Sequence, residues 1–199
     1  MKKVIFVLLL IFLSQLHADY SHKITELHTR YSNLNTFEAN IVQTNYFSMI
    51  DNSSVSNGKI YITKDTVILE YTAPAYQFAK LEGSKITVYS QAENTAVVSN
   101  ETDANITRIM NLPNLISSEM RFVEKENDTL IFSMVTPTDN IRNLKIYVPE
   151  NQNLISKISY SDTEDNTITI ALTNQNFNRT LTKRPAQFVI PSGATTIEH

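Results

Sequence analysis

Residues 58–74 read GKIYITKDTVILEYTAP, two short runs of β-branched and aromatic residues joined by a polar turn. This pattern predicts a β-hairpin. Alternation gives its two strands the apolar positions Ile60, Ile62, Val67, Leu69 and Tyr71. The opposite faces still carry Tyr61 and Ile68, as if each face must meet a dry surface. The simplest explanation is that helices cover one face while the other carries scattered exposed residues. The alternative is that one face binds an apolar ligand.

The segments before the hairpin predict a helix and then a strand. Apolar residues recur at helical spacing after residue 19, at Tyr20, Ile24, Leu27, Tyr31 and Leu34. From Phe37 to Gln43 the period changes to two, which predicts a half-buried strand. Residues 51–58, DNSSVSNG, are rich in turn-forming residues and predict a loop.

The segments after the hairpin predict a meander of antiparallel strands. Strand-like runs occur at 77–81, 85–89, 95–98, 121–125, 129–135, 143–148, 154–160 and 167–172, with a last extended piece at 187–191. Residues 104–120 have helical spacing instead, and Pro113 predicts two short helices or one kinked helix there. Ten or eleven strands and two helical segments in one domain predict a mainly β, α+β fold. A single antiparallel sheet of that size curves into a barrel or leaves an open concave face, which helices would cover.

The N-terminus predicts export. Lys2 and Lys3 precede the apolar run VIFVLLLIFL, and Ala18 supplies the small residue at a cleavage point. We therefore expect a signal peptide over residues 1–18 and one mature domain over residues 19–199. The chain contains no cysteine, which excludes disulfides, thiolate catalysis and a lipidated N-terminal cysteine.

Composition argues against nucleic-acid binding and catalysis. The net charge is −3, and loss of Lys2 and Lys3 would make it −5, so no basic surface is expected for nucleic acid. The mature histidines, His22, His28 and His199, do not accompany a serine and an aspartate in a triad-like pattern. Residues 161–166, SDTEDN, lack the glycine and distal glutamate of a calcium loop and predict a hairpin turn. We therefore expect a protein that is not an enzyme, with neither metal nor cofactor.

The order of these segments resembles the outer-membrane lipoprotein carrier family, the LolA-type periplasmic chaperones. The matching pieces are FEANIVQ at 37–43, GKIYI and ILEYTAP in the hairpin, GSKITVY at 83–89, Phe177, and FVIPSG at 188–193. The resemblance extends from about residue 20 to residue 197. Each piece is loose, but together their order and spacing are fairly specific.

The resemblance implies an unclosed, strongly bent antiparallel β-barrel with a helical lid over its concave face. It implies a monomeric periplasmic chaperone that receives acylated lipoproteins from an inner-membrane ABC transporter, shields their acyl chains and delivers them to the outer membrane, where a receptor would accept them. This function suits the sequence, because each buried methylene is worth about 0.8 kcal/mol and long acyl chains do not leave a bilayer unaided.

The resemblance also assigns residues. Val67, Leu69 and Tyr71 match the family strand whose side chains face the cavity, and Ile60 and Ile62 match the preceding strand. Ile106, Ile109, Met110 and Leu112 fall where the lid helix lies. The family's Lys-Arg-Pro turn is replaced by Thr63, Lys64 and Asp65, so Lys64 is the nearest stand-in for the arginine that latches the lid. A lysine lacks the planar fork of a guanidinium. Leu69 stands where the family has tryptophan.

Two other functions are consistent with parts of the sequence. The same fold occurs in periplasmic regulators that restrain an envelope-stress anti-sigma factor, although these usually carry a second C-terminal domain. An enzyme with an unrecognised site is the other alternative, which the positions of the histidines disfavour.

Overall fold

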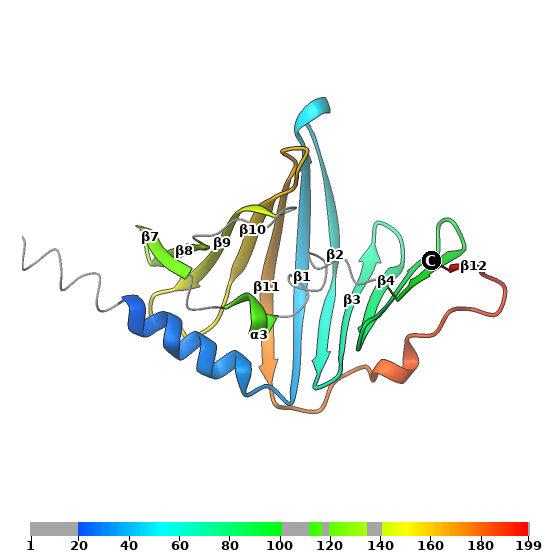
Figure 1. The fold of residues 1–199 in the computed structure, drawn as a ribbon, viewed down its shortest axis with the longest axis horizontal. Helices are drawn as coiled ribbons and strands as arrows, with labels where there is room; N and C mark the ends of the chain where they lie inside the picture. Colours follow the sequence, from blue (N-terminus) through cyan, green and yellow to red (C-terminus); the bar gives the residue numbers. More distant parts are fainter. Residues whose placement is uncertain (1–19, 101–111, 117–119, 135–140, 199) are drawn as a thin grey trace, which may run out of the picture.

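The computed structural model describes residues 20–100, 112–116, 120–134 and 141–198, and these form one curved sheet of twelve strands (Figure 1). The strand order is β12-β6-β5-β4-β3-β2-β1-β11-β10-β9-β8-β7. Neighbours pair antiparallel except β12, which pairs parallel with β6. In this order β7 and β12 end the sheet and do not pair with each other, so the barrel is incomplete. The mainly β fold expected from the sequence is confirmed.

The strands are β1 (Thr36–Phe47), β2 (Asn52–Thr63), β3 (Thr66–Ala73), β4 (Gln77–Glu82), β5 (Lys85–Ser90), β6 (Thr95–Ser99), β7 (Met120–Glu126), β8 (Thr129–Met134), β9 (Arg142–Pro149), β10 (Lys157–Ser161), β11 (Thr167–Phe177) and β12 (Thr195–Glu198). An N-terminal helix spans residues 20–32, and α3 (Leu112–Leu115) is a single short turn. Two 3-10 helices, η1 (Ser48–Ile50) and η2 (Pro185–Gln187), lie in connections.

The main core lies on one face of the sheet, which we call the inner face. It combines side chains of β1 to β5 and β7 to β11 with Leu27 and Tyr31 of the N-terminal helix and Leu112 of α3. This is why an apolar stripe appears at helical spacing before the first strand. Both helices therefore pack against the inner face, and Figure 1 shows them in front of the sheet.

A second core lies on the opposite, outer face. It consists of Tyr61, Ile68, Phe78, Tyr89, Ala96 and Phe188. Phe188 belongs to residues 178–194, which we call the C-terminal segment. Figure 1 shows this segment, orange to red, running from β11 past the ends of the central strands to β12. The part of the outer face that carries this core is thus covered by the chain itself.

Three details of the sequence-based prediction are wrong. Residues 52–58 are strand rather than loop, because β2 pairs with β1 along its whole length, from Asn52 opposite Phe47 to Thr63 opposite Thr36. Residues 187–191 are not a strand; Gln187 ends η2, and residues 188–191 are irregular chain. The last strand is β12, which no alternation in the sequence indicates and which forms by parallel pairing with β6.

Candidate functional site

The β2–β3 hairpin places all five predicted apolar residues on the inner face. Leu69 lies opposite Ile60, and Val67 lies opposite Ile62. Four of the five are buried in the inner core, and Leu69 is partly buried against it. The structure therefore brings together Ile60, Ile62, Val67, Leu69 and Tyr71.

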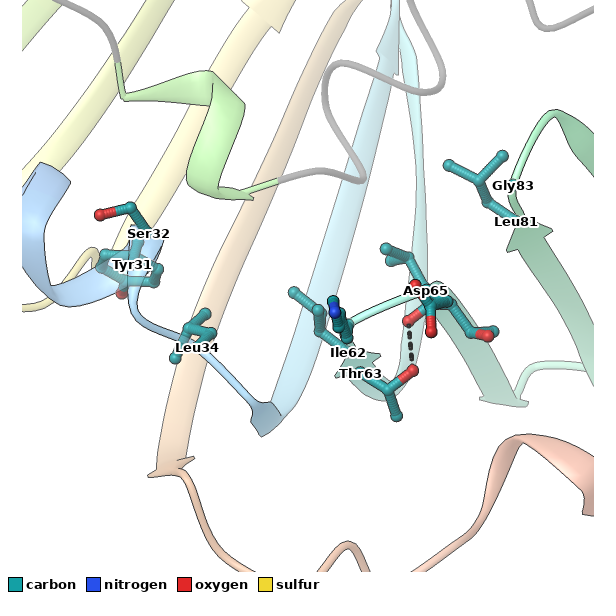
Figure 2. A pocket seen from close by; sticks show the side chains of 11 residues that line it. Tyr31, Ser32, Leu34, Ile62, Thr63, Asp65, Leu81 and Gly83 are labelled. Atoms are coloured by element: carbon teal, nitrogen blue, oxygen red, sulfur yellow. Dashed lines mark hydrogen bonds between the residues drawn. The ribbon is translucent and has the colours of Figure 1, made fainter.

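A pocket of about 480 Å³ opens on the inner face beside this group (Figure 2). Figure 2 shows it between the end of the N-terminal helix and the end of β4, above the β2–β3 turn. Its lining consists of Tyr31, Ser32, Leu34, Ile62, Thr63, Lys64, Asp65, Thr66, Val67, Leu81 and Gly83. The apolar wall and the predicted site thus share Ile62 and Val67, and the charged side chains stand at the exposed turn.

Tyr31 fixes the helical wall of the pocket. Its hydroxyl donates to Gln175 Oε1 at 3.0 Å and accepts from Ile155 N at 3.0 Å, while Gln175 Nε2 donates to Ile155 O at 2.7 Å. Burial raises the pKa of Tyr31 to about 12, so the hydroxyl stays neutral. At the other end of the helix, Lys23 Nζ donates to Glu150 O and to Asn153 Oδ1, at 3.0 and 2.6 Å. The helix is therefore tied to the β9–β10 side of the sheet.

Among the described residues, the polar groups beside Tyr71 on the inner face are neutral hydroxyls and amides. The Tyr71 hydroxyl donates to Gln43 Oε1. Burial, and then the nearby Tyr160, raise the pKa of Tyr71 well above its usual value, and burial raises the pKa of Tyr160 to about 12. These side chains place no net charge on the inner face at neutral pH.

The remaining predicted residues are less closely grouped. Leu112 of α3 is 1% exposed and belongs to the inner core, with Leu115 and Ile116 beside it in sequence and also buried. Ile106, Ile109 and Met110 lie outside the described residues. Lys64 is exposed in the β2–β3 turn and lines the pocket, and within the described part of the chain it forms no hydrogen bond or ion pair that would latch a helix.

The outer face carries polar contacts that the sequence analysis missed. Glu38 and Glu70 are 5% and 3% exposed. Glu38 accepts from Lys59 Nζ at 2.7 Å and from the backbone and hydroxyl of Thr182 at 2.7 and 2.6 Å. Glu70 pairs with Lys183 and accepts from the Tyr61 hydroxyl at 3.1 Å. The sequence did contain a signal for these contacts. Glu70 lies inside the strand VILEYT, and a carboxylate at such a position indicates that another part of the chain covers the outer face and pairs with it.

Glu38 is held as a carboxylate by these contacts. Although desolvation raises its pKa, the hydrogen bonds from Lys59 and Thr182 outweigh that effect, so the pKa of Glu38 lies below its ordinary value. Glu38 and Glu70 therefore attach the C-terminal segment at residues 182 and 183 to the outer face.

Other kinds of site find no support in the part of the chain that the structure describes. No three histidine, cysteine, aspartate or glutamate side chains there gather to hold a metal ion. Among the same residues, no helix combines the length and apolar character needed to span a membrane. Residues 161–166 form a hairpin turn, as predicted, in which Asp162 Oδ1 accepts from the backbone N–H groups of Glu164 and Asn166, both at 2.9 Å.

Comparison with solved structures places the fold among known proteins. An uncharacterised conserved protein from Thermus thermophilus superposes with a TM-score of 0.55 at 11% identity, over 88% of this chain and 98% of that one. A MucB structure superposes with a TM-score of 0.52 at 12% identity, over 89% of this chain and 65% of MucB. The MucA/MucB complex of Pseudomonas aeruginosa gives 0.50 at 14% identity, over 90% and 63%. At these identities the likeness shows the fold alone.

The sequence comparison is more specific. No curated protein sequence matches the chain. The model of the outer membrane lipoprotein carrier protein LolA matches residues 32–189, which include β1 to β11 and most of the C-terminal segment. That match covers well over half of the chain, and the chain therefore belongs to the outer membrane lipoprotein carrier protein LolA family.

Proposed function

We propose that this protein is a periplasmic carrier that holds the acyl chains of lipoproteins against its inner face, without catalysing a reaction. The observation that carries the proposal is the continuous apolar surface of the β2–β3 hairpin beside an open pocket of about 480 Å³. Membership of the LolA family also supports a carrier function. The proposed contact residues are Ile60, Ile62, Val67, Leu69, Tyr71, Ile106, Ile109, Met110 and Leu112.

The physical basis of the proposal is the hydrophobic effect. Each methylene that leaves a bilayer for water costs about 0.8 kcal/mol, so an acyl chain needs an apolar surface throughout its journey. An inner face with neutral hydroxyls and amides provides such a surface without burying charge. The charged side chains of Lys64 and Asp65 remain at the rim, where water or the polar part of the cargo can solvate them.

The size of the pocket suggests how cargo would enter. A volume of about 480 Å³ suits one drug-sized ligand, so several long chains need more of the inner face. Burial of Leu112, Leu115 and Ile116 holds the described part of α3 against the inner face. We propose that acyl chains replace these three side chains on the inner face, and that α3 forms part of the lid.

Lys64 is proposed to act at the mouth of the pocket as a lid latch. It stands exposed at the β2–β3 turn, which lines the pocket, and the ammonium can donate up to three hydrogen bonds. Because lysine is flexible and lacks a fixed fork, such a latch would hold less firmly than an arginine. The proposed partners are acylated lipoproteins, an inner-membrane ABC transporter that releases them, and an outer-membrane receptor.

A second candidate function follows from the superposition on MucB and on the MucA/MucB complex. The protein would then sense lipid or lipoprotein and regulate an envelope-stress response by binding a protein partner. The chain covers 65% and 63% of those MucB chains, so their activity belongs to longer proteins. The two candidates differ in whether binding of the protein partner requires acyl chains on that partner.

The test compares one peptide in two forms. Purified mature protein is titrated with a tripalmitoylated cysteine lipopeptide and with the same peptide without acyl chains, and binding is followed by calorimetry. A carrier binds the acylated form at least about a hundredfold more tightly, because the apolar contacts dominate. Equal binding of the two forms would overturn the proposal.

A further inference from the structure

The β1–β2 hairpin ends in an apolar tip. Met49 is 87% exposed and Ile50 is 69% exposed, while Tyr46 and Phe47 beside them are each 38% exposed. These residues, Tyr46–Ile50, include η1 and lie at the end of the two longest strands of the sheet. Figure 1 shows the tip, in cyan, standing beyond the neighbouring hairpin turn. A single exposed aliphatic residue is ordinary, but four large apolar side chains within five positions are not.

The tip has a defined conformation, because a neighbouring turn supports it. Ser48 N donates to Asn166 Oδ1 at 3.2 Å, and Ser48 Oγ donates to Glu164 O at 3.1 Å, both in the β10–β11 turn. The Tyr46 hydroxyl donates to Asp51 Oδ1 at 2.9 Å. The backbone of the tip is therefore held by polar groups, and its apolar side chains are left to the solvent. Such pre-organisation lowers the entropy cost of binding to a surface.

The small size of the tip decides between kinds of partner. A stable protein interface buries about 800 Å² on each side and involves about 20–30 residues. Four apolar side chains on one narrow hairpin end are far fewer. Binding to the interfacial layer of a bilayer needs fewer contacting side chains. A few aromatic and aliphatic residues can insert there reversibly and without a matching pocket.

The charges around the tip narrow the choice of lipid. Asp51 follows the tip, and Asp162, Glu164 and Asp165 occupy the supporting turn. Within the described residues, Arg142 pairs with this group, at 3.5 Å from Asp165. The collar around the tip is therefore acidic. It is attracted by the ammonium groups of ethanolamine headgroups and repelled by anionic headgroups.

We propose that Tyr46–Ile50 is a membrane-contact tip that inserts Met49 and Ile50 into the interface of a bilayer rich in phosphatidylethanolamine. The tip is well separated from the acyl-chain pocket. Asn52 and Thr63 are the two ends of β2, roughly 36 Å apart at the usual rise of a strand, and the pocket lies at the Thr63 end. This inference goes beyond the proposed carrier function and does not depend on it.

The experiment is flotation of purified mature protein with large vesicles of phosphatidylethanolamine and phosphatidylcholine in equal amounts. We expect wild type to float with the vesicles and the double variant Met49→Ser, Ile50→Ser to bind more than about tenfold more weakly. The control is Val123→Ser, Val189→Ser, which removes two aliphatic side chains that are 49% and 66% exposed elsewhere. It should float like wild type.

Two further measurements complete the test. Replacing the phosphatidylcholine by phosphatidylglycerol should weaken flotation, and Glu164→Gln should restore part of it. Wild type that fails to float, or a tip variant that floats like wild type, overturns the proposal. The proposal is also overturned if sedimentation shows that wild type self-associates and the tip variant does not, because the tip would then bind a second copy.

Lipopeptide binding is measured on the same variants. If the tip variant binds lipopeptide but no longer floats, the tip is needed for membrane contact and not for cargo binding. If wild type floats but binds no lipopeptide, the carrier function is wrong and the membrane-contact tip stands.

Discussion

The two faces of the β2–β3 hairpin are both apolar but are covered in different ways. On the outer face, Tyr61 and Ile68 pack in a closed core with Phe188 of the C-terminal segment. On the inner face, Ile62 and Val67 line a pocket of about 480 Å³. The alternation of the hairpin does not distinguish these outcomes, since each face carries residues of the same kind.

The difference lies in how each cover is attached. The outer cover combines aromatic contacts with an ion pair to a buried carboxylate. Phe188 lies 5.5 Å from Tyr61 and 5.8 Å from Phe78, ring centre to ring centre, and Lys183 pairs with Glu70. On the inner face, α3 contributes the buried apolar side chains of Leu112 and Leu115. Apolar contact of this kind is a cover that acyl chains can replace. The outer cover therefore stabilises the fold, and we propose that the inner cover can be exchanged for cargo.

The largest effect is expected from opening the outer face. Phe188→Ala should lower the free energy of unfolding by about 3–5 kcal/mol, because it empties the centre of a buried aromatic cluster. Denaturant unfolding measures this. The adjacent Val189→Ala, at a position that is 66% exposed, is the control and should change stability by less than about 0.5 kcal/mol. Equal losses for the two variants would mean that the C-terminal segment does not close the outer face.

Gly58 provides the next test, because it fixes which residues face each side. The β2–β3 register shifts between Asn57 and Gly58, and a Cβ at Gly58 would stand 1.9 Å from Glu70 O. Gly58→Ala should therefore force the strands apart and cost about 3 kcal/mol. Gly193→Ala meets no atom within 4 Å and serves as the control in the same thermal unfolding series. A stable Gly58→Ala protein would contradict the close approach of these strands.

A smaller, pH-dependent effect is expected at Glu38. Its pKa is lowered in the folded protein, so its contribution to stability is complete above the ordinary value of 4.5 and is lost as the pH falls through the lower, folded value. Glu38→Gln should lose about 1–2 kcal/mol at pH 7 and unfold with a weaker pH dependence in the acid range. Glu82→Gln, at a surface pair with Lys80, is the control. Identical acid unfolding of wild type and Glu38→Gln would refute this assignment.

The smallest effect is expected at Lys64 on the inner side. Lys64→Gln should change the free energy of unfolding by less than about 0.5 kcal/mol, because the side chain is exposed. If Lys64 holds the lid, the variant should release a fluorescent lipopeptide about two- to threefold faster in stopped-flow displacement. Lys85→Gln, at another exposed lysine, should leave the rate unchanged. Unchanged release from Lys64→Gln would remove Lys64 from the mechanism.

Sequence reasoning predicted the fold well where local pattern and tertiary environment agree. The alternation in residues 60–71 identified the strands, and the helical spacing in residues 20–34 identified the helix that covers the sheet. Residues 52–58 were mistaken for a loop because they extend a solvated hairpin, where neither face needs apolar residues. β12 was missed because a short strand that forms by pairing with β6 carries no pattern of its own.

The candidate site was harder to predict from the sequence than the fold was. Alternation grouped Ile60, Ile62, Val67, Leu69 and Tyr71, because cross-strand neighbours share a face. It could not show that Tyr31 and Leu81, from the helix and from β4, complete the pocket. Nor could it show that Glu38 meets Thr182, since that contact joins residues 144 positions apart. Contacts of this kind depend on the path of the whole chain.

The most direct test of the account compares one polar substitution on each face. Leu69→Gln changes the inner face, and Val42→Gln changes β1 at an outer position that is 39% exposed. Both variants should remain folded by circular dichroism, and both are titrated with the tripalmitoylated lipopeptide. We predict that Leu69→Gln weakens binding by at least about tenfold and Val42→Gln by less than about twofold. Equal binding by the two variants would contradict the central claim that the inner face holds the acyl chains.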